Sequence, residues 1–570
     1  METAAGQGDR VETASLPERL AVSILALGAV AAPLVFRSLD DNRLTSWRWV
    51  FAEADPTRIY ALVAAGIVLA HLLARAPLPR KRPATILLLA AYATAALFWG
   101  QPEVIVDAAR TFTQAKQLEL RGLGGFLAEW GREIPAWTDL PLVPLLFGLV
   151  FDLLGESRVH AQALTTLLFA GSVALTFRLG RDLWDEEVGF LGGALLLAIP
   201  YLLTQVPGML SDVPTMFFLT LAVHAVVRAF QRGGAGRILL ASLAVVLALL
   251  SKYSAWLLLS VVPVVGVVHL RGGAPRPLRT GSAIALLAGS ILAGLLLSRR
   301  DVFSGQLALL AGYQAPGLRR WGESFTSTFL FQVHPFLTAA ASISIWAAIR
   351  RRDPRYAIVA WPVLLLVALQ VQRIRYLIPI FPMLALMAAN GLQSIRAREV
   401  RRLVVACAVA SSLIVARYGY LPFLEGNSLG NLERAGGYLD TVDEERVEVF
   451  TPLAPDAEVN PAVAVPLLDL YTHKTVIYRP EEIPPSARER AAASPLRFTW
   501  EFQVPGTYAG DGGERATAVA VVSDDVGSPL PEHVEARLRG RRLARVFATD
   551  EGVFRFRTMV RVYREGAGEP

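Results

Sequence analysis

Apolar residues form long, nearly charge-free runs through roughly the first 420 residues. Runs of about 15–20 residues are long enough to cross a bilayer core of about 30 Å, so they predict about 13 transmembrane helices. The runs fall near residues 20–37, 58–75, 84–100, 161–179, 188–206, 212–230, 237–251, 255–270, 280–298, 330–349, 356–371, 374–392 and 402–420. The polar segment Ser251-Lys252-Tyr253-Ser254 separates the seventh run from the eighth, because such side chains are unfavourable at a bilayer centre.

The pattern changes at Leu421 to short β-like runs, with helical segments and prolines between them. The β-like runs are Arg446–Phe450, Thr475–Tyr478, Leu496–Phe502, Ala516–Val522, Leu543–Phe547 and Met559–Tyr563, and the helical patterns cover 430–440, 462–471 and 530–539. This predicts a small α/β domain with its own core. The expected fold is therefore mainly α, a polytopic helical membrane protein with a C-terminal α/β domain.

Three parts follow from these patterns. Residues 1–83 form an N-terminal tail and an extra transmembrane hairpin, residues 84–420 form the main membrane module, and residues 421–570 form the soluble domain. Within the membrane module, residues 101–160 form a loop of unusual length, which usually indicates function. Its segment 140–154 is apolar but interrupted, which favours a helix that lies along the interface or re-enters the membrane.

Composition and charge distribution narrow the class of protein. The chain of 570 residues is 53% hydrophobic and only 18% charged, which excludes an ordinary soluble enzyme and a disordered chain. Its single cysteine excludes an intramolecular disulfide framework and a thiolate zinc cluster. Residues 421–570 carry a net charge of −7, which leaves +14 for residues 1–420. We attribute this basic excess to cytoplasmic loops and not to nucleic-acid binding.

The basic loops predict the orientation in the membrane. Densely basic loops occur at 75–83, 228–237, 271–279, 350–355 and 393–402, and the predicted spans place all of them on one side. By the positive-inside rule that side is cytoplasmic. We therefore expect a multi-pass protein of the cytoplasmic (inner) membrane, with a cytoplasmic N-terminus and an extracytoplasmic C-terminal domain.

Two acidic residues at membrane edges need an explanation. Asp107 follows three β-branched residues just past a span. It is either a carboxylate that takes a proton from a hydroxyl or binds a metal, or the N-cap of a helix over 108–120. Asp212, in Ser211-Asp212-Val213-Pro214, is either a second site acid or a helix start, which Asp followed by Pro favours.

Further charged residues come out on the same outer face as these acids: Lys252, His334, Arg373 and Arg375. Cations at a bilayer edge suit an anionic lipid headgroup such as a phosphate, although basic side chains at helix ends also snorkel. For Arg375 we favour the phosphate. His334 is either a metal ligand or proton shuttle or a packed interfacial histidine. Asp139 is either a solvated charge or, like His334, a ligand for a metal or an acceptor.

Several motifs in this order resemble the GT-C glycosyltransferases. They are Asp107 just past a span, the run Pro141-Leu142-Val143-Pro144-Leu145-Leu146-Phe147-Gly148, Ser157 and His160, the Ser211–Pro214 segment and Arg375-Tyr376-Leu377-Ile378-Pro379. The resemblance covers about residues 84–392. It is strongest to the protein O-mannosyltransferase and lipid A aminoarabinose transferase branch.

The resemblance implies a hexosyl or pentosyl transfer from a polyprenyl-phosphate sugar to an acceptor hydroxyl outside the cytoplasm, with inversion. It implies Asp107 as the base, Asp212 as a second acid, and Arg375, Lys252 and Arg373 near the donor phosphate. The acceptor is left open among lipid, glycan and protein, as is the participation of a divalent metal ion; membrane lipids are the other expected partners.

The chain also departs from the family pattern. Ala108 follows Asp107 where the family commonly has an Asp-Glu pair, and Asp139 precedes Leu140-Pro141 where a basic residue is usual. These departures raise the alternative of a catalytically silent subunit of a membrane complex. A secondary transporter is a third alternative, although the halves of the chain show no symmetry. If the N-terminal hairpin supplies the catalytic loop, Asp40 or Asp41 becomes the base.

Overall fold

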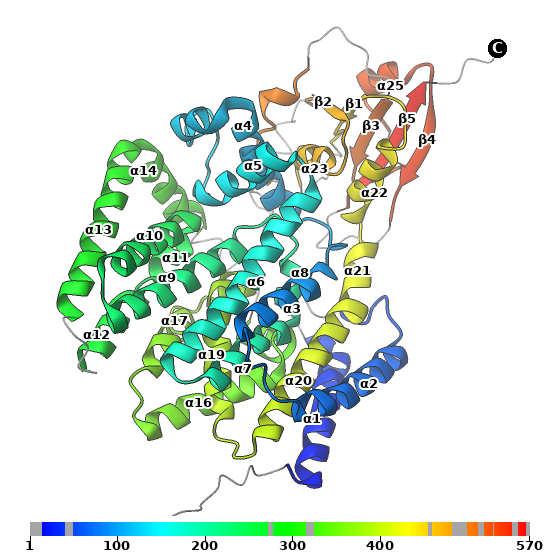
Figure 1. Ribbon diagram of the computed structural model, residues 1–570. Helices are drawn as coiled ribbons and strands as arrows, with labels where there is room; N and C mark the ends of the chain where they lie inside the picture. The colour runs from blue at the N-terminus through cyan, green and yellow to red at the C-terminus, as the bar shows by residue number, and fades with distance from the viewer. Residues whose placement is uncertain are drawn as a thin grey trace, which may run out of the picture.

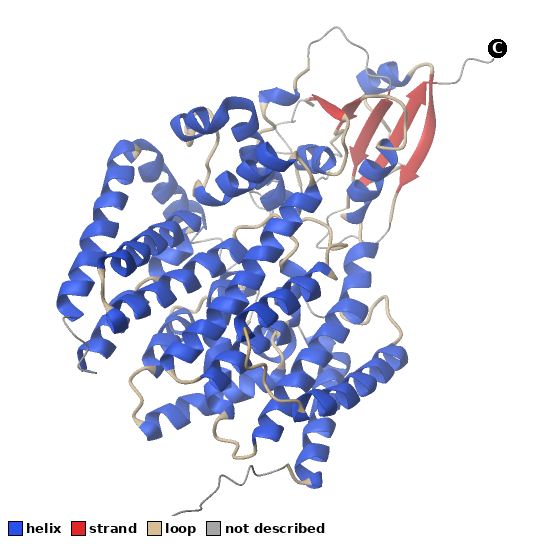
Figure 2. Ribbon diagram, in the orientation of Figure 1, coloured by secondary structure: helices blue, strands red, loops and turns tan. Residues whose placement is uncertain are grey.

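A computed structural model describes residues 14–39, 49–271, 277–314, 324–453, 459–481, 489, 499–510, 518–527, 529–549 and 557–565. The chain is mostly helical, and its strands are confined to one end of the molecule (Figure 2). Within the described residues, eight helices are long and apolar enough to cross a membrane. The expected fold class is therefore confirmed, while the count of 13 spans stays a prediction.

The helices of the membrane module are α1 (Leu16–Phe36), α2 (Pro56–Arg75), α3 (Pro83–Ala96), α6 (Arg158–Leu183), α7 (Glu186–Leu195), α8 (Pro200–Gln205), α9 (Asp212–Arg232), α10 (Ala235–Ser251), α11 (Tyr253–Leu258), α12 (Val261–Arg271), α13 (Pro277–Ser298), α14 (Arg300–Leu309), α16 (Pro335–Arg351), α17 (Tyr356–Ala368), α18 (Ile374–Leu377), α19 (Phe381–Leu392) and α20 (Arg398–Ile414). The predicted span 188–206 is not one continuous helix. It is divided into α7, a 3-10 turn at Leu196–Ala198 and α8, because Pro200 cannot donate a backbone hydrogen bond inside a helix.

The polar break between the seventh and eighth predicted spans is confirmed. Helix α10 ends at Ser251, and Lys252 has an extended backbone (φ −165°, ψ 145°) before α11 begins at Tyr253. The break interrupts the helical hydrogen-bond ladder at Lys252. The ammonium group of Lys252 bonds to the carboxylate of Asp212 at the start of α9.

The long loop folds into two helices, α4 (Ile105–Glu129) and α5 (Leu142–Leu154), which pack against each other. Helix α4 begins earlier than predicted: Val104 is its N-cap residue and Asp107 lies in its first turn. The prediction of Asp107 as an N-cap is therefore wrong. A carboxylate in the first turn still interacts favourably with the helix dipole, and this position leaves its side chain directed away from the cap.

The C-terminal domain is a five-stranded sheet with the order β2-β1-β3-β5-β4. Its elements are β1 (Arg446–Phe450), β2 (Thr475–Arg479), β3 (Ala518–Ser523), β4 (Arg541–Phe547), β5 (Met559–Glu565), α22 (Gly430–Leu439), α23 (Val465–Leu470) and α25 (Glu532–Leu538). Strands β1, β2 and β3 pair in parallel, whereas β5 pairs antiparallel with β3 and β4. The predicted strand Leu496–Phe502 is wrong in its described part, because residues 499–502 form a turn.

The core of the C-terminal domain continues into the long loop. Phe112 and Phe151 from the loop belong to the same buried cluster as Leu468 of α23 and Val449 of β1. In Figure 1 the domain lies directly beside α4 and α5. Because burial of such side chains stabilises a contact by about 1.5–3 kcal/mol each, the domain holds the long loop in place.

A buried ionic group fixes the residues just before α4. The carboxylate of Glu103 is fully buried, accepts a hydrogen bond from Met209 N at 2.8 Å and pairs with Arg158. Arg158 also pairs with Glu433 of α22 at 2.7 Å, and the backbone N–H of Glu103 donates to Tyr471 Oη at 3.0 Å. The start of α4 is therefore tied both to the membrane module and to the C-terminal domain.

Candidate functional site

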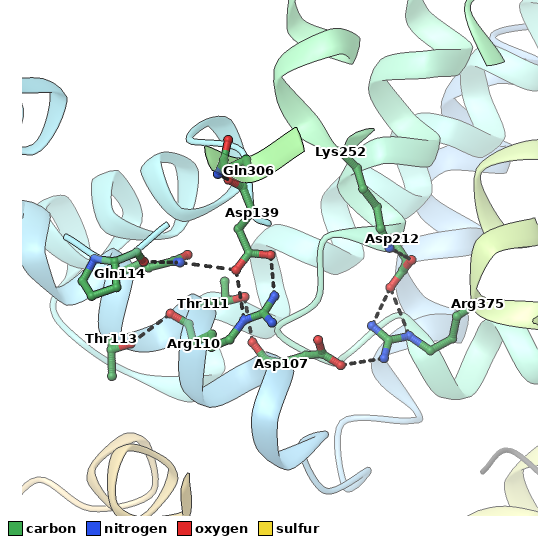
Figure 3. Close-up of polar contacts among 11 residues, drawn as sticks. Asp107, Arg110, Thr111, Thr113, Gln114, Asp139, Asp212, Lys252, Gln306 and Arg375 are labelled. Atoms are coloured by element: carbon green, nitrogen blue, oxygen red, sulfur yellow. Dashed lines mark hydrogen bonds and ion pairs between the residues drawn. The ribbon is translucent and has the colours of Figure 1, made fainter. Parts of the chain in front are cut away.

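Arg375 joins the two acids that the sequence singled out. Its Nη1 donates to Asp107 Oδ2 at 2.7 Å, while Nη2 and Nε donate to Asp212 Oδ2 at 2.9 and 3.2 Å (Figure 3). The three residues come from the starts of α4, α9 and α18, which are far apart in the chain. The guanidinium thus bridges two carboxylates, with two nitrogens on one and a single nitrogen on the other.

Lys252 completes the membrane side of this group. Its Nζ donates to Asp212 Oδ1 at 2.5 Å, so both oxygens of that carboxylate are bound to cations. The ring of Tyr376 lies under two cations, with the Lys252 Nζ at 5.1 Å from its centroid and the Arg373 guanidinium carbon at 5.4 Å. Cation–π contacts of this kind orient flexible basic side chains. Lys252, Arg373 and Arg375 therefore gather at one edge of the membrane module.

Asp139 lies on the other side of Asp107 and is held by the long loop. Arg110, one helical turn after Asp107, donates to both Asp139 oxygens at 2.6 and 3.0 Å. The backbone carbonyl of Asp139 accepts a hydrogen bond from Gln306 of α14 at 2.7 Å, and Gln306 Oε1 accepts one from Tyr253 Oη at 2.6 Å. These contacts connect the long loop to α14 and to the break after α10.

Exposure differs sharply between the two acids. The Asp212 side chain is fully buried, whereas the Asp107 side chain is 31% exposed. Burial by itself raises the pKa of Asp107, but Arg375 and Arg110 oppose it strongly, and the net pKa lies well below the usual range of aspartate. Asp107 is therefore a carboxylate throughout the neutral pH range, and of the two acids bonded to Arg375 it is the one within reach of solvent.

The formal charges of the group leave one positive charge over. Four cations are present, Arg110, Lys252, Arg373 and Arg375, against three carboxylates, Asp107, Asp139 and Asp212. The sum is +1. A partly buried group with one unbalanced positive charge favours a singly charged anion in its vicinity.

The hydrogen bonds of His334 are made with residues outside this group. Its Nε2 lies 2.9 Å from Ser411 Oγ, and its Nδ1 accepts a hydrogen bond from Phe336 N at the start of α16. This is the geometry of a packed histidine that caps a helix, which was one of the two readings of the sequence. The alternative acids Asp40 and Asp41 lie outside the described residues.

The residues present do not fit a resident divalent metal ion. In the part of the chain that the structure describes, no three His, Cys, Asp or Glu side chains come together as ligands. At the site itself two carboxylates converge, and the Arg375 guanidinium lies bonded between them. Ca²⁺ and Mg²⁺ require several oxygen ligands, which these residues do not supply.

Three site residues were not predicted from the sequence: Arg110, Tyr253 and Gln306. The spacing of Arg110 from Asp107 was the available signal, because residues three apart share a helix face. Tyr253 stands in the polar break, but nothing in its sequence context indicates Gln306 as its partner.

Comparisons with known proteins agree with this architecture. A family model described as dolichyl-phosphate-mannose-protein mannosyltransferase matches residues 138–299. The solved structure of ArnT from Cupriavidus metallidurans bound to undecaprenyl phosphate superposes with a TM-score of 0.53 at 11% identity and covers 84% of this chain and 97% of that one. The apo structure of the same protein gives 0.51 at 13% identity, with the same coverage. No curated protein sequence matches the chain.

These matches confirm the resemblance to the GT-C glycosyltransferases and the shared fold. The family model matches only residues 138–299, and the ArnT structures, at 11% and 13% identity, show a shared fold.

Proposed function

We propose that this protein transfers a sugar from a polyprenyl-phosphate donor to an acceptor hydroxyl, with Asp107 as the general base. The observation that carries the proposal is the position of Arg375. It places one guanidinium between a solvent-accessible carboxylate and a buried one at the edge of a membrane module. Such an arrangement brings a phosphate-binding cation next to a proton acceptor.

The donor side is formed by Arg375, Lys252 and Arg373. A polyprenyl-phosphate sugar is a phosphodiester with one negative charge, which matches the unbalanced charge of +1 in the group. When the glycosidic bond breaks, charge develops on the leaving phosphate, and fixed cations stabilise this charge most in the transition state. The position of these cations at a bilayer edge also lets the lipid tail remain in the membrane.

The acceptor side is formed by Asp107. As the acceptor oxygen attacks the anomeric carbon, the hydroxyl proton moves to an Asp107 oxygen, and the lipid phosphate leaves from the opposite face. One direct displacement of this kind inverts the anomeric configuration. Asp212 is fully buried, and we assign it the role of positioning Arg375 and Lys252 rather than contacting the sugar.

The reaction takes place on the side of the membrane where the C-terminal domain lies. The site is built from the start of α4, and the domain packs against that same helix. The densely basic loops predicted from the sequence are on the opposite side, and we place them in the cytoplasm. Transfer is then extracytoplasmic, with a lipid, glycan or protein hydroxyl as acceptor.

The test is turnover of a panel of polyprenyl-phosphate sugars by the purified full-length protein. We expect sugar release or transfer by the wild type and a loss of about 10²–10⁴-fold in Asp107→Asn. Asp152→Asn is the matched control, because Asp152 is an exposed acid on α5 of the same loop. Equal activity in both variants would move the base elsewhere. A folded wild type without turnover of any donor, recovered with stoichiometric partners, would favour the silent subunit.

A further inference from the structure

Arg375 contacts both sides of the proposed reaction, because it is assigned to the donor phosphate and is bonded to Asp107, the proposed base. A guanidinium has five N–H donors, and all three nitrogens of Arg375 are bonded to Asp107 and Asp212. A phosphate that approaches Arg375 therefore competes with carboxylates that already hold it.

The two carboxylates are held unequally. Asp212 accepts from two Arg375 nitrogens and from Lys252, and its side chain is fully buried. Asp107 accepts from a single Arg375 nitrogen and is 31% exposed. An incoming anion consequently displaces the Asp107 contact more readily than the Asp212 contacts.

We propose that a lipid phosphate and Asp107 compete for Arg375, so that donor binding releases the Asp107 carboxylate and must precede activation of the acceptor. This inference rests on the proposed function for the class of donor. In the structure the base is held by the same cation that, in the proposed reaction, binds the leaving group. Binding of the donor exchanges one anion for another at Nη1 of Arg375 and leaves Asp107 free to accept a proton.

The other charges around Asp107 are compatible with this exchange. Arg110 faces it from its own helix and Arg373 from the residue before α18, and both lower its pKa. The groups behind this first layer are Asp139 beside Arg110, and Asp212, Lys252 and Tyr201 around Arg375. After release from Arg375, Asp107 remains ionised beside Arg110 but becomes a stronger proton acceptor.

The exchange predicts that removal of the Asp107 charge tightens phosphate binding. The probe is undecaprenyl phosphate, titrated against the full-length protein in detergent, with undecaprenol as the uncharged control lipid. We expect Asp107→Asn to bind undecaprenyl phosphate about ten-fold more tightly than the wild type, since a competing anion has been removed. Lys252→Ala should bind it more weakly.

Asp139→Asn is the matched control because it removes the same charge from the same loop without touching Arg375. Long-range electrostatics act on both variants, whereas competition for Arg375 acts only on Asp107→Asn. Asp107→Ser serves in the same comparison if Asp107→Asn does not reach the thermal stability of the wild type.

Each outcome of this titration either supports or overturns the exchange at Arg375. Tighter binding by Asp107→Asn than by both the wild type and Asp139→Asn supports the exchange. Equal effects of the two variants, or weaker binding by Asp107→Asn, overturn it and leave the proposed function standing. A wild type that binds undecaprenyl phosphate no better than undecaprenol overturns both the exchange and the proposed donor class.

Discussion

Lys252 and Tyr253 are neighbours in the chain, yet their side chains hold opposite sides of the candidate site. Lys252 donates to Asp212 on the membrane side, while Tyr253 donates to Gln306, which in turn holds the backbone of Asp139. Arg375 then joins Asp212 to Asp107, and Arg110, one helical turn after Asp107, bonds to Asp139 (Figure 3). The break between α10 and α11 is thus the element that positions both the donor side and the acceptor side.

Tyr253→Phe tests this role of the break. The variant keeps the ring but loses the hydrogen bond to Gln306, so we expect a loss of stability of about 1 kcal/mol. Because the acceptor side loosens while Lys252 stays in place, KM for the acceptor should rise several-fold with little change in donor affinity. Steady-state kinetics with each substrate varied in turn separate the two effects. Tyr418→Phe is the control, since Tyr418 is 44% exposed; a rise in donor KM instead would contradict this division of the site.

Arg375→Lys tests the bridging guanidinium. An ammonium group retains the charge but cannot bond two carboxylates in the forked geometry that Arg375 shows. We expect kcat to fall about 10²–10³-fold, because the developing charge on the phosphate loses an oriented donor. Single-turnover rates with a polyprenyl-phosphate sugar measure this directly. If Arg375→Lys retains wild-type kcat, charge alone suffices and the forked geometry has no role in the reaction.

The low pKa of Asp107 predicts the acidic side of the pH profile. A group with a folded pKa below its usual value is ionised at higher pH and becomes protonated only as the pH falls through that lowered pKa. We therefore expect kcat/KM of the free enzyme to be independent of pH between about 5 and 7 with respect to this base. A fall in kcat/KM as the pH drops through about 6 would contradict this expectation. If the fall persists in Asp139→Asn, a group other than Asp107 or Asp139 is the base.

Sequence patterns predicted the parts of the site that depend on local chemistry. The polar break at Lys252, the acid at the start of α9 and the five strands that begin within two residues of their observed starts all follow from short-range patterns. The pairing of Arg375 with Asp107 spans 268 positions, and hydrophobic periodicity carries no information on such a contact. In the sequence, the two residues are related only by the outer face on which the predicted spans place them both.

The errors have equally specific causes. The prediction of a strand over Leu496–Phe502 followed β-propensity, which depends on context. In the structure Phe502 stacks on Trp137 of the long loop, with ring centroids 5.8 Å apart, and the chain turns there. Asp107 was considered as an N-cap because Asp suits that position, but Val104 takes it without a side-chain hydrogen bond.

The side chains of the candidate site predict that sugar transfer continues after divalent metal ions have been removed with a chelator. Asp107 and Asp212 are both bonded to Arg375, and this guanidinium lies where a bridging cation would have to bind. We expect EDTA dialysis to change the transfer rate less than two-fold, which is within the scatter expected for residual ionic effects. The check is activity before and after dialysis, with metal content measured on the same sample. A loss restored by one added divalent metal would show that the site binds it in place of the Arg375 contacts.

Glu156 predicts a pH-dependent contact between the long loop and the C-terminal domain. Lys116 of α4 pairs with Asp469 of α23 at 2.5 Å and with Glu156 at 3.3 Å. Burial raises the pKa of Glu156, Lys116 lowers it and Asp469 raises it, with a net value of about 7. The folded state therefore holds a proton that the unfolded chain, with a carboxyl pKa near 4.5, releases.

A folded pKa above the unfolded one stabilises the protein at low pH, and this stability is lost as the pH rises from about 4.5 through about 7. Glu156→Gln removes the titration, so we expect it to be more stable than the wild type at pH 8, on the order of 1 kcal/mol, and little different at pH 5. Thermal unfolding of both proteins across this range measures the difference. Glu133→Gln is the control, because Glu133 is an exposed acid of the same loop and is not among the charges that shift the pKa of Glu156. The contradicting result is a stability difference between Glu156→Gln and the wild type that does not change with pH. Glu156 would then be ionised in the folded protein at neutral pH, and its protonation would not affect the contact between the long loop and the C-terminal domain.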